Sequence, residues 1–328
     1  MNSVVQQKCD LVIKNREQVG KAFLLEGSII KVLAGIAYAE KDMTADVDKI
    51  KECQKLLKKK QGFFSEMRGN NEIIVSTKMS LSDDPEKFIE DLITVYGKLQ
   101  KGKIFGSAHR VLAALTICEA DKVSEADEII EKANEILKGM NKKHRFLTSD
   151  EDTAFAVLLA MCHKSVDEIL TELENSFQIL KKNFTLNDNA VYSLSQILTI
   201  YDGASEEKCE KVMNIYDCFE KAGHKYGKGY ELASLGSFLE LSMNKDELVS
   251  EIIETADYLK ENKGFGALDM NNKMRLMIAG MIVSNVMSKD DNIAQTSVIG
   301  GALSMIIAQE AAMVAAIIAT STVASVSN

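Results

Sequence analysis

The stretch VDEILTELENSFQIL, residues 166–180, decides the fold class of this chain. Ile169, Leu173 and Leu180 recur in it at the spacing of one face of an α-helix, with charged residues between them. A strand would instead alternate apolar and polar residues with a period of about two. The stretch therefore predicts an amphipathic helix with one buried face.

The same helical pattern occurs twice more, as EKFIEDLITVYGKL (86–99) and DELVSEIIETADYL (246–259). Phe88, Ile169 and Leu248 occupy equivalent positions, and the two intervals between them are almost equal. Apolar residues follow each of them four and eleven places later. One helix face is thus repeated along the chain, which is typical of helical arrays in which each unit packs on the next.

A second pair of segments supports the same period. KVLAGIAYAE (31–40) resembles RVLAALTICE (110–119) at nearly the same offset, and the segments at 190–202 and 273–285 stand at the matching place further on. Polar residues placed to cap the helix that follows each segment are Thr44, Ser124, Ser205 and Ser288. We predict an all-α fold, a helical-repeat array of about four units of about 80 residues with an Ala/Gly-rich C-terminal helix.

The repeats define the expected domain organisation. We predict a single all-helical domain over residues 1–328, with units at approximately 1–62, 63–143, 144–224 and 225–328. The boundaries read as loops, because no stretch rich in Pro, Gly or Ser separates the halves. In KGMNKKHRFLTSDED (138–152), Thr148 or Ser149 is the expected cap, and in SLSDDPEKF (80–88) the cap is Ser82, Asp83 or Asp84 with Pro85 in the first turn.

Composition favours helices and disfavours several functions. The 328 residues are 46% hydrophobic and include one proline and no tryptophan, which suits a helical globular protein. The net charge of −9 argues against nucleic acid as a partner. Six dispersed cysteines without a CxxC pair, and an N-terminus with scattered charges, predict a cytoplasmic protein whose thiols are reduced and half-buried.

The apolar segment AAMVAAIIATSTVASV (311–326) poses a separate question. Gln309 and Glu310 interrupt it upstream, so it lacks the roughly 20 consecutive apolar residues of a membrane span. We predict no span and favour a buried C-terminal helix over a self-association or partner surface. The candidate interface residues are Ala308, Ala312, Met313, Ala316 and Ile317.

No catalytic, cofactor-binding or metal-ligating residue is assigned from the sequence, and no cofactor is expected. The four histidines, at 109, 144, 163 and 224, form no metal-ligand motif. GHKYGKGYE (223–231) departs from the phosphate-loop spacing. The acidic clusters lack the ligand set of a calcium loop, and Cys162 and His163 point in different directions on a helix.

Four segments together resemble a known family: HRFLTSDEDTAFAVLLA, LSQILTIYD, MRLMIAGMIVSN and IIAQEAAMVAAIIATSTVA. The resemblance is to uncharacterised bacterial proteins, mostly from Gram-positive bacteria, grouped as domain of unknown function four thousand and three. It implies a helical fold over most of the chain and assigns no activity, so no site residue is carried over.

The function expected from this architecture is that of a noncatalytic cytosolic helical scaffold that binds a protein or peptide. One alternative is an enzyme or small-ligand-binding protein with a pocket between repeats, near Lys138 or Gly223. Another is a homo-oligomeric structural protein assembled through the C-terminal helix. Whether the protein is an enzyme stays open, with the balance of features against it.

Overall fold

The computed structural model describes residues 1–62, 65–185 and 187–290. Within these residues the chain forms thirteen α-helices and four 3₁₀-helices, and no strand. The prediction of an all-α fold is therefore confirmed.

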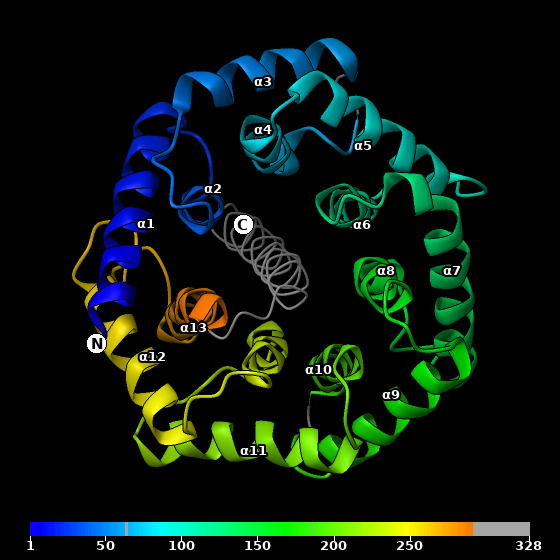
Figure 1. Cartoon of the computed structure of the whole chain (residues 1–328), viewed down its shortest axis with the longest axis vertical. Helices are drawn as coiled ribbons and strands as arrows, with labels where there is room; N and C mark the ends of the chain where they lie inside the picture. The colour runs from blue at the N-terminus through cyan, green and yellow to red at the C-terminus, as the bar shows by residue number, and fades with distance from the viewer. Residues whose placement is uncertain (63–64, 186, 291–328) are drawn as a thin grey trace, which may run out of the picture.

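Seven helices of the described chain form an outer belt around the molecule (Figure 1). They lie along the circumference and follow one another in chain order. The belt consists of α1 (Ser3–Ala22), α3 (Val47–Lys60), α5 (Pro85–Gln100), α7 (Ala126–Lys143), α9 (Val166–Lys181), α11 (Ser205–Lys221) and α12 (Lys245–Lys260).

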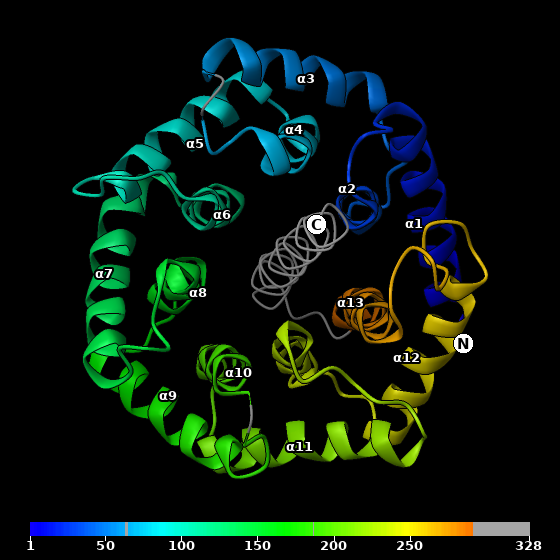
Figure 2. The ribbon, with the colours of Figure 1, turned by 180° about the vertical axis from the view of Figure 1, so that it is seen from behind.

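A second set of helices stands inside the belt, seen nearly end-on in Figure 1 and again from behind in Figure 2. Each follows one outer helix in the chain, so outer and inner helices alternate. The inner set is α2 (Ser28–Glu40), α4 (Glu72–Leu81), α6 (Ala108–Glu119), α8 (Thr153–Ala160), α10 (Asp188–Ile200), the 3₁₀-helix η4 (Tyr230–Phe238) and α13 (Asn272–Asp290). Shorter 3₁₀ turns, η1 (Gly69–Asn71), η2 (Val123–Glu125) and η3 (Asp150–Asp152), lead into α4, α7 and α8.

The two layers close into a ring. The first helix, α1, packs against α12 and α13 near the end of the described chain. The N-terminal ammonium group bonds to Glu254 of α12, and the Asn2 amide donates to Glu251 at 2.7 Å. Each outer helix and the inner helix that follows it form a hairpin. Because the first described hairpin packs against the last one, every described hairpin has a neighbour on both sides.

The sequence distinguishes the two layers. Outer helices are amphipathic: α9 buries Ile169, Leu173 and Leu180 and exposes charged residues on its other side. Inner helices are enclosed by neighbours, and every residue of α8 (TAFAVLLA) is buried. A helix that is apolar all round must be buried on all sides, which places such segments inside the belt.

Helix starts follow the expected capping chemistry in part. Asp84, Ser165 and Asn244 cap α5, α9 and α12 and are separated by two almost equal intervals. Phe88, Ile169 and Leu248 each come four residues after one of these caps. Pro85 is the first residue of α5, and Ser149 forms a capping box with Asp152 at η3, as predicted.

Other expected caps were wrong. Asp46, not Thr44, caps α3. Ser205 is the first residue of α11, and Ser124 lies within η2. Ser288 lies inside α13, where its hydroxyl donates to the Ser284 carbonyl, because the apolar run from Asn272 continues as one helix to Asp290. A serine at the sequence interval expected for a cap does not by itself end the helix that precedes it.

Two kinds of connection join the layers. Short connections of three to six residues lead from an inner helix to the next outer helix. The connections that lead from an outer helix inward have five to eleven residues and are here named the long loops; they span 23–27, 61–71, 101–107, 144–152, 182–187, 222–229 and 261–271.

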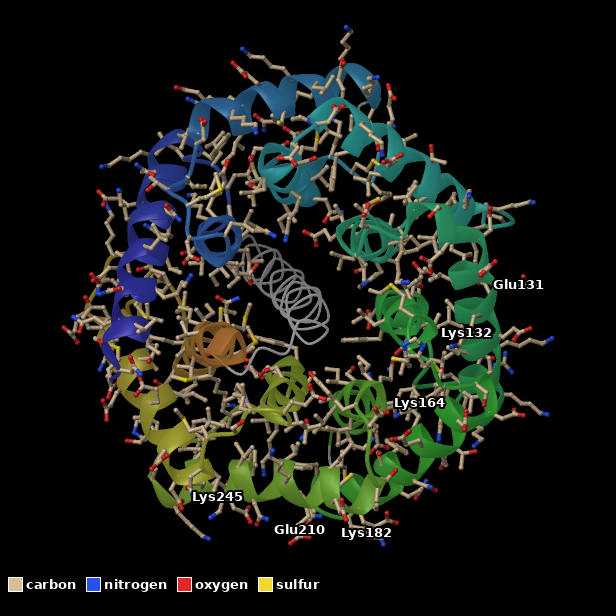
Figure 3. The ribbon with its side chains drawn as sticks, in the orientation of Figure 1. Glu131, Lys132, Lys164, Lys182, Glu210 and Lys245 are labelled. Atoms are coloured by element: carbon tan, nitrogen blue, oxygen red, sulfur yellow. The ribbon has the colours of Figure 1, made fainter. Side chains whose placement is uncertain are left out.

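Two lysines, Lys132 of α7 and Lys164 of the short connection 161–165, bond to carbonyls at or just beyond the C-terminal ends of inner helices. The Lys132 ammonium donates to the Cys162 carbonyl at 2.7 Å, and Lys164 donates to the Thr199 and Tyr201 carbonyls, each at 2.8 Å. Figure 3 shows Lys132 and Lys164 between belt and inner helices, whereas Glu131 and Lys182 lie at the periphery. These bonds supply partners that a helix C-terminus otherwise lacks.

Of the six cysteines, which were expected to be half-buried, Cys118, Cys162 and Cys218 are half-buried, whereas Cys9, Cys53 and Cys209 are buried; all six are free thiols. The predicted C-terminal helix and its candidate interface residues at 308, 312, 313, 316 and 317 lie outside the described residues.

Candidate binding groove

The outer surface carries a groove between the end of α5 and the side of α7. It consists of two adjoining pockets of about 460 Å³ and about 510 Å³ that share Leu99, Lys103, Asn134 and Lys138. We name it the α5–α7 groove. Its remaining lining residues are Lys98, Lys101, Arg110, Asp127, Ile130, Glu131, Glu135, Leu137, Asn141, Thr148, Ser149, Asp150 and Thr153.

The floor of the groove is one stripe of α7. Asp127, Ile130, Asn134, Lys138 and Asn141 follow one another at three- and four-residue intervals and therefore share a face of the helix. The strongly apolar side of α7, with Ala133 and Ile136, packs into the ring instead. The four polar residues of the stripe are thus left to solvent, whereas Ile130 is buried.

The long loop 101–107 forms one wall and is held from within. The Gln100 side-chain amide donates to the Phe105 carbonyl at 2.7 Å and to the Lys103 carbonyl at 3.3 Å. The Ser107 amide donates to the Tyr96 hydroxyl at 3.2 Å. These bonds fix the backbone that carries Lys103, so the wall is pre-organised.

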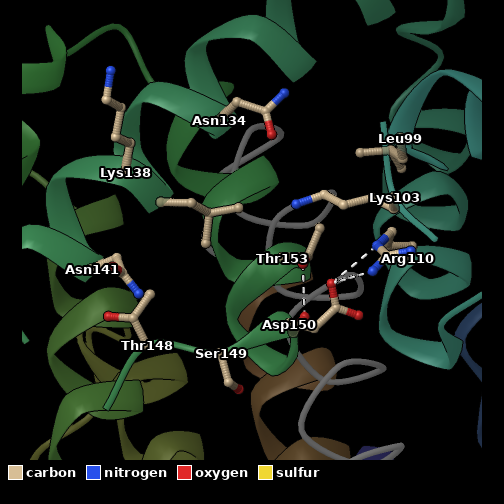
Figure 4. A pocket seen from close by; sticks show the side chains of 11 residues that line it. Leu99, Lys103, Arg110, Asn134, Lys138, Asn141, Thr148, Ser149, Asp150 and Thr153 are labelled. Atoms are coloured by element: carbon tan, nitrogen blue, oxygen red, sulfur yellow. Dashed lines mark hydrogen bonds and ion pairs between the residues drawn. The ribbon is translucent and has the colours of Figure 1, made fainter. Parts of the chain in front are cut away.

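Arg110 ties this wall to the next one. Its guanidinium donates to Gln100 Oε1 at 2.5 Å and to the Phe105 carbonyl at 2.8 Å. Nη2 lies 2.8 Å from Asp150 Oδ1, at the start of η3 (Figure 4). Since the Arg110 side chain is largely buried and its charge is compensated, it shapes the groove and is not a free cation.

Three other cations of the groove, Lys101, Lys103 and Lys138, have no bonding partner among the described residues. Lys103 extends its ammonium across the pocket towards α7, as Figure 4 shows, and Lys138 stands on the opposite side. The amides of Asn134 and Asn141 are likewise unengaged within the described chain. A bound group could therefore receive hydrogen bonds from two ammonium groups and two amides.

The other end of the groove is acidic. Glu131 and Glu135 line it, while Lys98 and Asp127 neutralise each other at 2.8 Å. The groove thus carries unpaired positive charge beside the long loops and unpaired negative charge towards the start of α7. Such a charge pattern selects the direction of a bound chain as well as its composition.

Behind the groove lies a polar cluster that supports its floor. Asp152 accepts hydrogen bonds from the Ser149 amide at 2.8 Å and from Gln196 Nε2 at 2.7 Å. Burial raises the pKa of Asp152 to about 6 although these bonds oppose the shift. Nearby, His144 Nε2 lies 2.7 Å from Glu174 Oε2, and its ring packs on Phe177 and Tyr192.

The positions weighed for chemistry in the sequence remain apart. His144 bonds to Glu174, while His109 lies at the start of α6, where burial lowers its pKa. Within the described residues, no three His, Cys, Asp or Glu side chains gather as a metal site would require. No helix in that same part of the chain has the length and apolarity to cross a bilayer.

Sequence reasoning located this site only in part. It named the loop at Lys138 as a place for a pocket, and Lys138 does line the groove; the loop at Gly223 does not line it. It missed Gln100 and Arg110, which come from one hairpin, and Asp150, which comes from the next. The available signal was the pair of lysines in loop 101–107, since Lys101 and Lys103 lack acidic neighbours three or four residues away.

The described chain is a ring of helix hairpins with a groove at one junction between them. The chain belongs to the family described as "Protein of unknown function (DUF4003)", whose model matches residues 15–312. It is similar to the uncharacterised protein YeaA of Bacillus subtilis, at 25% identity over 302 residues, which cover 89% of this chain and 87% of that protein. No solved structure matches the chain.

Proposed function

We propose that the protein is a noncatalytic cytosolic helical scaffold that binds a peptide segment of a partner protein in the α5–α7 groove. The observation that carries the proposal is the pair of ammonium groups without a partner among the described residues: Lys103 on the pre-organised wall of loop 101–107, and Lys138 on α7 at the opposite side of the groove. Cytosolic location is supported by six free thiols, which persist in reducing compartments.

The dimensions of the groove suit a short chain segment. The α7 stripe from Asp127 to Asn141 is about 20 Å long at 1.5 Å per helical residue. An extended segment of about six residues covers that length. The expected segment has an acidic residue beside Lys103 and Lys138 and a basic residue beside Glu131 and Glu135.

Site-specific photocrosslinking tests the proposal. A photoreactive residue replacing Asn134 in the full chain should capture one partner in native lysate. Lys103→Glu with Lys138→Glu should reduce that capture by about tenfold or more, because repulsion replaces two charge-assisted bonds. Lys182→Glu, an exposed lysine of another hairpin, is the matched control and should leave capture unchanged. Capture that survives the double charge reversal would refute the groove as the site.

A small anionic ligand is the second candidate for the same groove. The pocket of about 460 Å³ falls within the range that small molecules occupy. Thermal unfolding of the full chain with a panel of di- and tricarboxylates separates the two. Thermal stabilisation by a carboxylate that is lost in Lys103→Glu favours the small ligand. If no carboxylate stabilises the protein and photocrosslinking captures a partner protein, the peptide is favoured.

We also propose that the chain is built from about four repeat units of about 80 residues, of which the first is incomplete at its front and each complete unit holds two outer and two inner helices. The outer helices from α3 onward begin at nearly even intervals of about half the repeat period, which supports a two-hairpin unit. The expected boundaries near 62, 143 and 224 all fall at long loops. Assembly of copies through the C-terminal helix stays a prediction, tested by comparing the oligomeric state of the full chain with that of a Met313→Glu variant.

A further inference from the structure

The largest exposed apolar side chains of the described residues gather on the long loops. Six of them, from 77% to 104% exposed, are Leu24, Leu25, Ile104, Phe105, Phe146 and Leu268. The two others, Val4 and Met43, are 49% and 47% exposed and lie elsewhere, at the start of α1 and in a short connection. Fully exposed leucine and phenylalanine side chains at loop tips do not stabilise the isolated protein, because they bury no apolar surface there.

The loops that carry these side chains form one arc of the ring. The Ser28 hydroxyl donates to the Gly264 carbonyl at 3.5 Å, which joins the beginning of α2 to loop 261–271. Glu66 of loop 61–71 lies against Gly106 of loop 101–107.

The arc continues through two further links. Glu26 is within electrostatic range of Lys58, which connects loop 23–27 to the end of α3. Arg110 and Asp150 connect the hairpin of loop 101–107 to that of loop 144–152. Five consecutive long loops therefore lie side by side on the same face.

This face is also the basic one, although the protein as a whole has a net charge of −9. Every outer helix reaches it with at least one lysine in its last turn: Lys21, Lys58, Lys59, Lys60, Lys98, Lys142, Lys143, Lys181, Lys221 and Lys260. Within the described residues, Lys21, Lys58, Lys60, Lys98 and Lys181 form ion pairs with acidic side chains, and the other five lysines form none. Lys101, Lys103, Arg145 and Lys263 add exposed charge within the arc itself.

The opposite face is acidic. Six of the seven described outer helices start there with acidic residues in the first turn, for example Asp167 and Glu168 of α9. Each helix separately favours this arrangement, because acids stabilise the N-terminus and bases the C-terminus. In the ring, the outer helices all begin on one face and end on the other. The acidic residues of their first turns therefore gather on one face and the basic residues of their last turns on the other.

We propose that the arc of long loops is a docking surface for an anionic phospholipid bilayer. The apolar tips would enter the headgroup region, while the surrounding lysines and arginines attract the anionic lipids. The tips protrude from separate loops, and a soft, flat surface accommodates such tips without matching pockets. A second copy of the chain that docked through its acidic face would complement the basic charge, but it would offer few exposed apolar side chains to the tips. A bilayer accounts for both the apolar tips and the basic charge.

The surface shares Lys101 and Lys103 with the α5–α7 groove, but the apolar tips and the charged residues changed in the tests below lie outside the groove. Leu25, Phe146 and Leu268 do not line the α5–α7 groove. Bilayer binding can therefore fail while peptide capture at Asn134 persists, and peptide capture can fail while bilayer binding persists.

Sedimentation with sucrose-loaded vesicles tests the proposal on the full chain. The protein should sediment with vesicles that contain phosphatidylglycerol and phosphatidylcholine in equal parts, and not with phosphatidylcholine alone. Leu25→Ser with Phe146→Ser should weaken binding by about tenfold or more, because two apolar side chains no longer leave water. Arg145→Gln with Lys263→Gln should weaken it by roughly fivefold per charge and reduce its sensitivity to salt.

Val4→Ser with Met43→Ser is the matched control away from the arc and should bind as the unchanged protein does. Absence of sedimentation with the anionic vesicles, or equal sedimentation with neutral ones, would overturn the proposal. So would self-association in the absence of lipid that is abolished by Leu25→Ser with Phe146→Ser, because the arc would then be an interface between copies.

Discussion

Arg110 and Asp150 join two neighbouring hairpins of the ring through a guanidinium–carboxylate contact. Nε and Nη2 of Arg110 approach the same oxygen, Asp150 Oδ1, at 3.0 and 2.8 Å. The remaining guanidinium nitrogen donates to Gln100 and to the Phe105 carbonyl. One side chain thus determines the relative position of both walls of the α5–α7 groove.

Replacing Arg110 with alanine should lower the free energy of unfolding by about 2–4 kcal/mol, because Asp150, Gln100 and the Phe105 carbonyl all lose their donor. Urea unfolding followed by circular dichroism measures the change. Lys101→Ala, an exposed residue of the same loop, should change stability by less than about 0.5 kcal/mol. Equal stability of the two variants would show that the guanidinium contributes no net energy.

The helices were predictable from the sequence, whereas the ring and its groove were not. Apolar spacing identified α5, α9 and α12. Side-chain chemistry narrowed two caps to Ser82, Asp83 or Asp84 and to Thr148 or Ser149, of which Asp84 and Ser149 act as caps. Closure depends on α1 meeting α12 and α13, a contact between opposite ends of the described chain that no local pattern encodes. The groove depends likewise on Arg110 meeting Asp150 across two hairpins.

Lys78 and Glu119 form a second link between inner helices, α4 and α6, at 2.5 Å. Burial lowers the pKa of Lys78, but the carboxylates of Glu119 and Glu40 outweigh it and raise the pKa overall. Lys78→Met should destabilise the fold by about 3–5 kcal/mol, because a partly buried carboxylate is left without its cation.

The double variant Lys78→Met with Glu119→Gln should recover a large part of that loss, since the uncompensated charge is removed as well. A double-mutant cycle in urea isolates the coupling between the two residues. Purely additive losses would mean that the pair does not interact energetically.

Asp152 should make stability depend on pH in the direction opposite to most carboxylates. Its pKa is about 6 in the folded ring against 3.8 ordinarily, so the folded state binds the proton more tightly. The resulting stabilisation is present in acid and is lost as pH rises from about 4 to above 6, with a total of about 3 kcal/mol.

Asp152→Asn should remove this dependence without large loss of structure, because Gln196 Oε1, which lacks a hydrogen-bond partner, can accept from the new amide. The measurement is the difference in unfolding free energy between variant and unchanged protein at pH 4.5 and 7.5, two values chosen to lie about one to two units on either side of the pKa. A difference that is the same at both values would contradict the raised pKa.

The close approach of α1 and α2 should make Gly35 intolerant of a methyl group. A Cβ at Gly35 would lie 2.9 Å from the Arg16 amide nitrogen and 3.1 Å from the Val12 carbonyl oxygen, both backbone atoms that cannot turn aside. Gly35→Ala should therefore cost about 1–3 kcal/mol by forcing the helices apart. The change is measured from the midpoint of urea unfolding.

Gly97, in the middle of the outer helix α5, is the matched control because nothing lies within 4 Å of its would-be Cβ. Gly97→Ala should raise the free energy of unfolding by about 0.5–1 kcal/mol, because alanine favours the helix. Opposite shifts of the two urea midpoints are the expected result. A stabilising Gly35→Ala would show that α1 and α2 are packed less closely than this geometry requires.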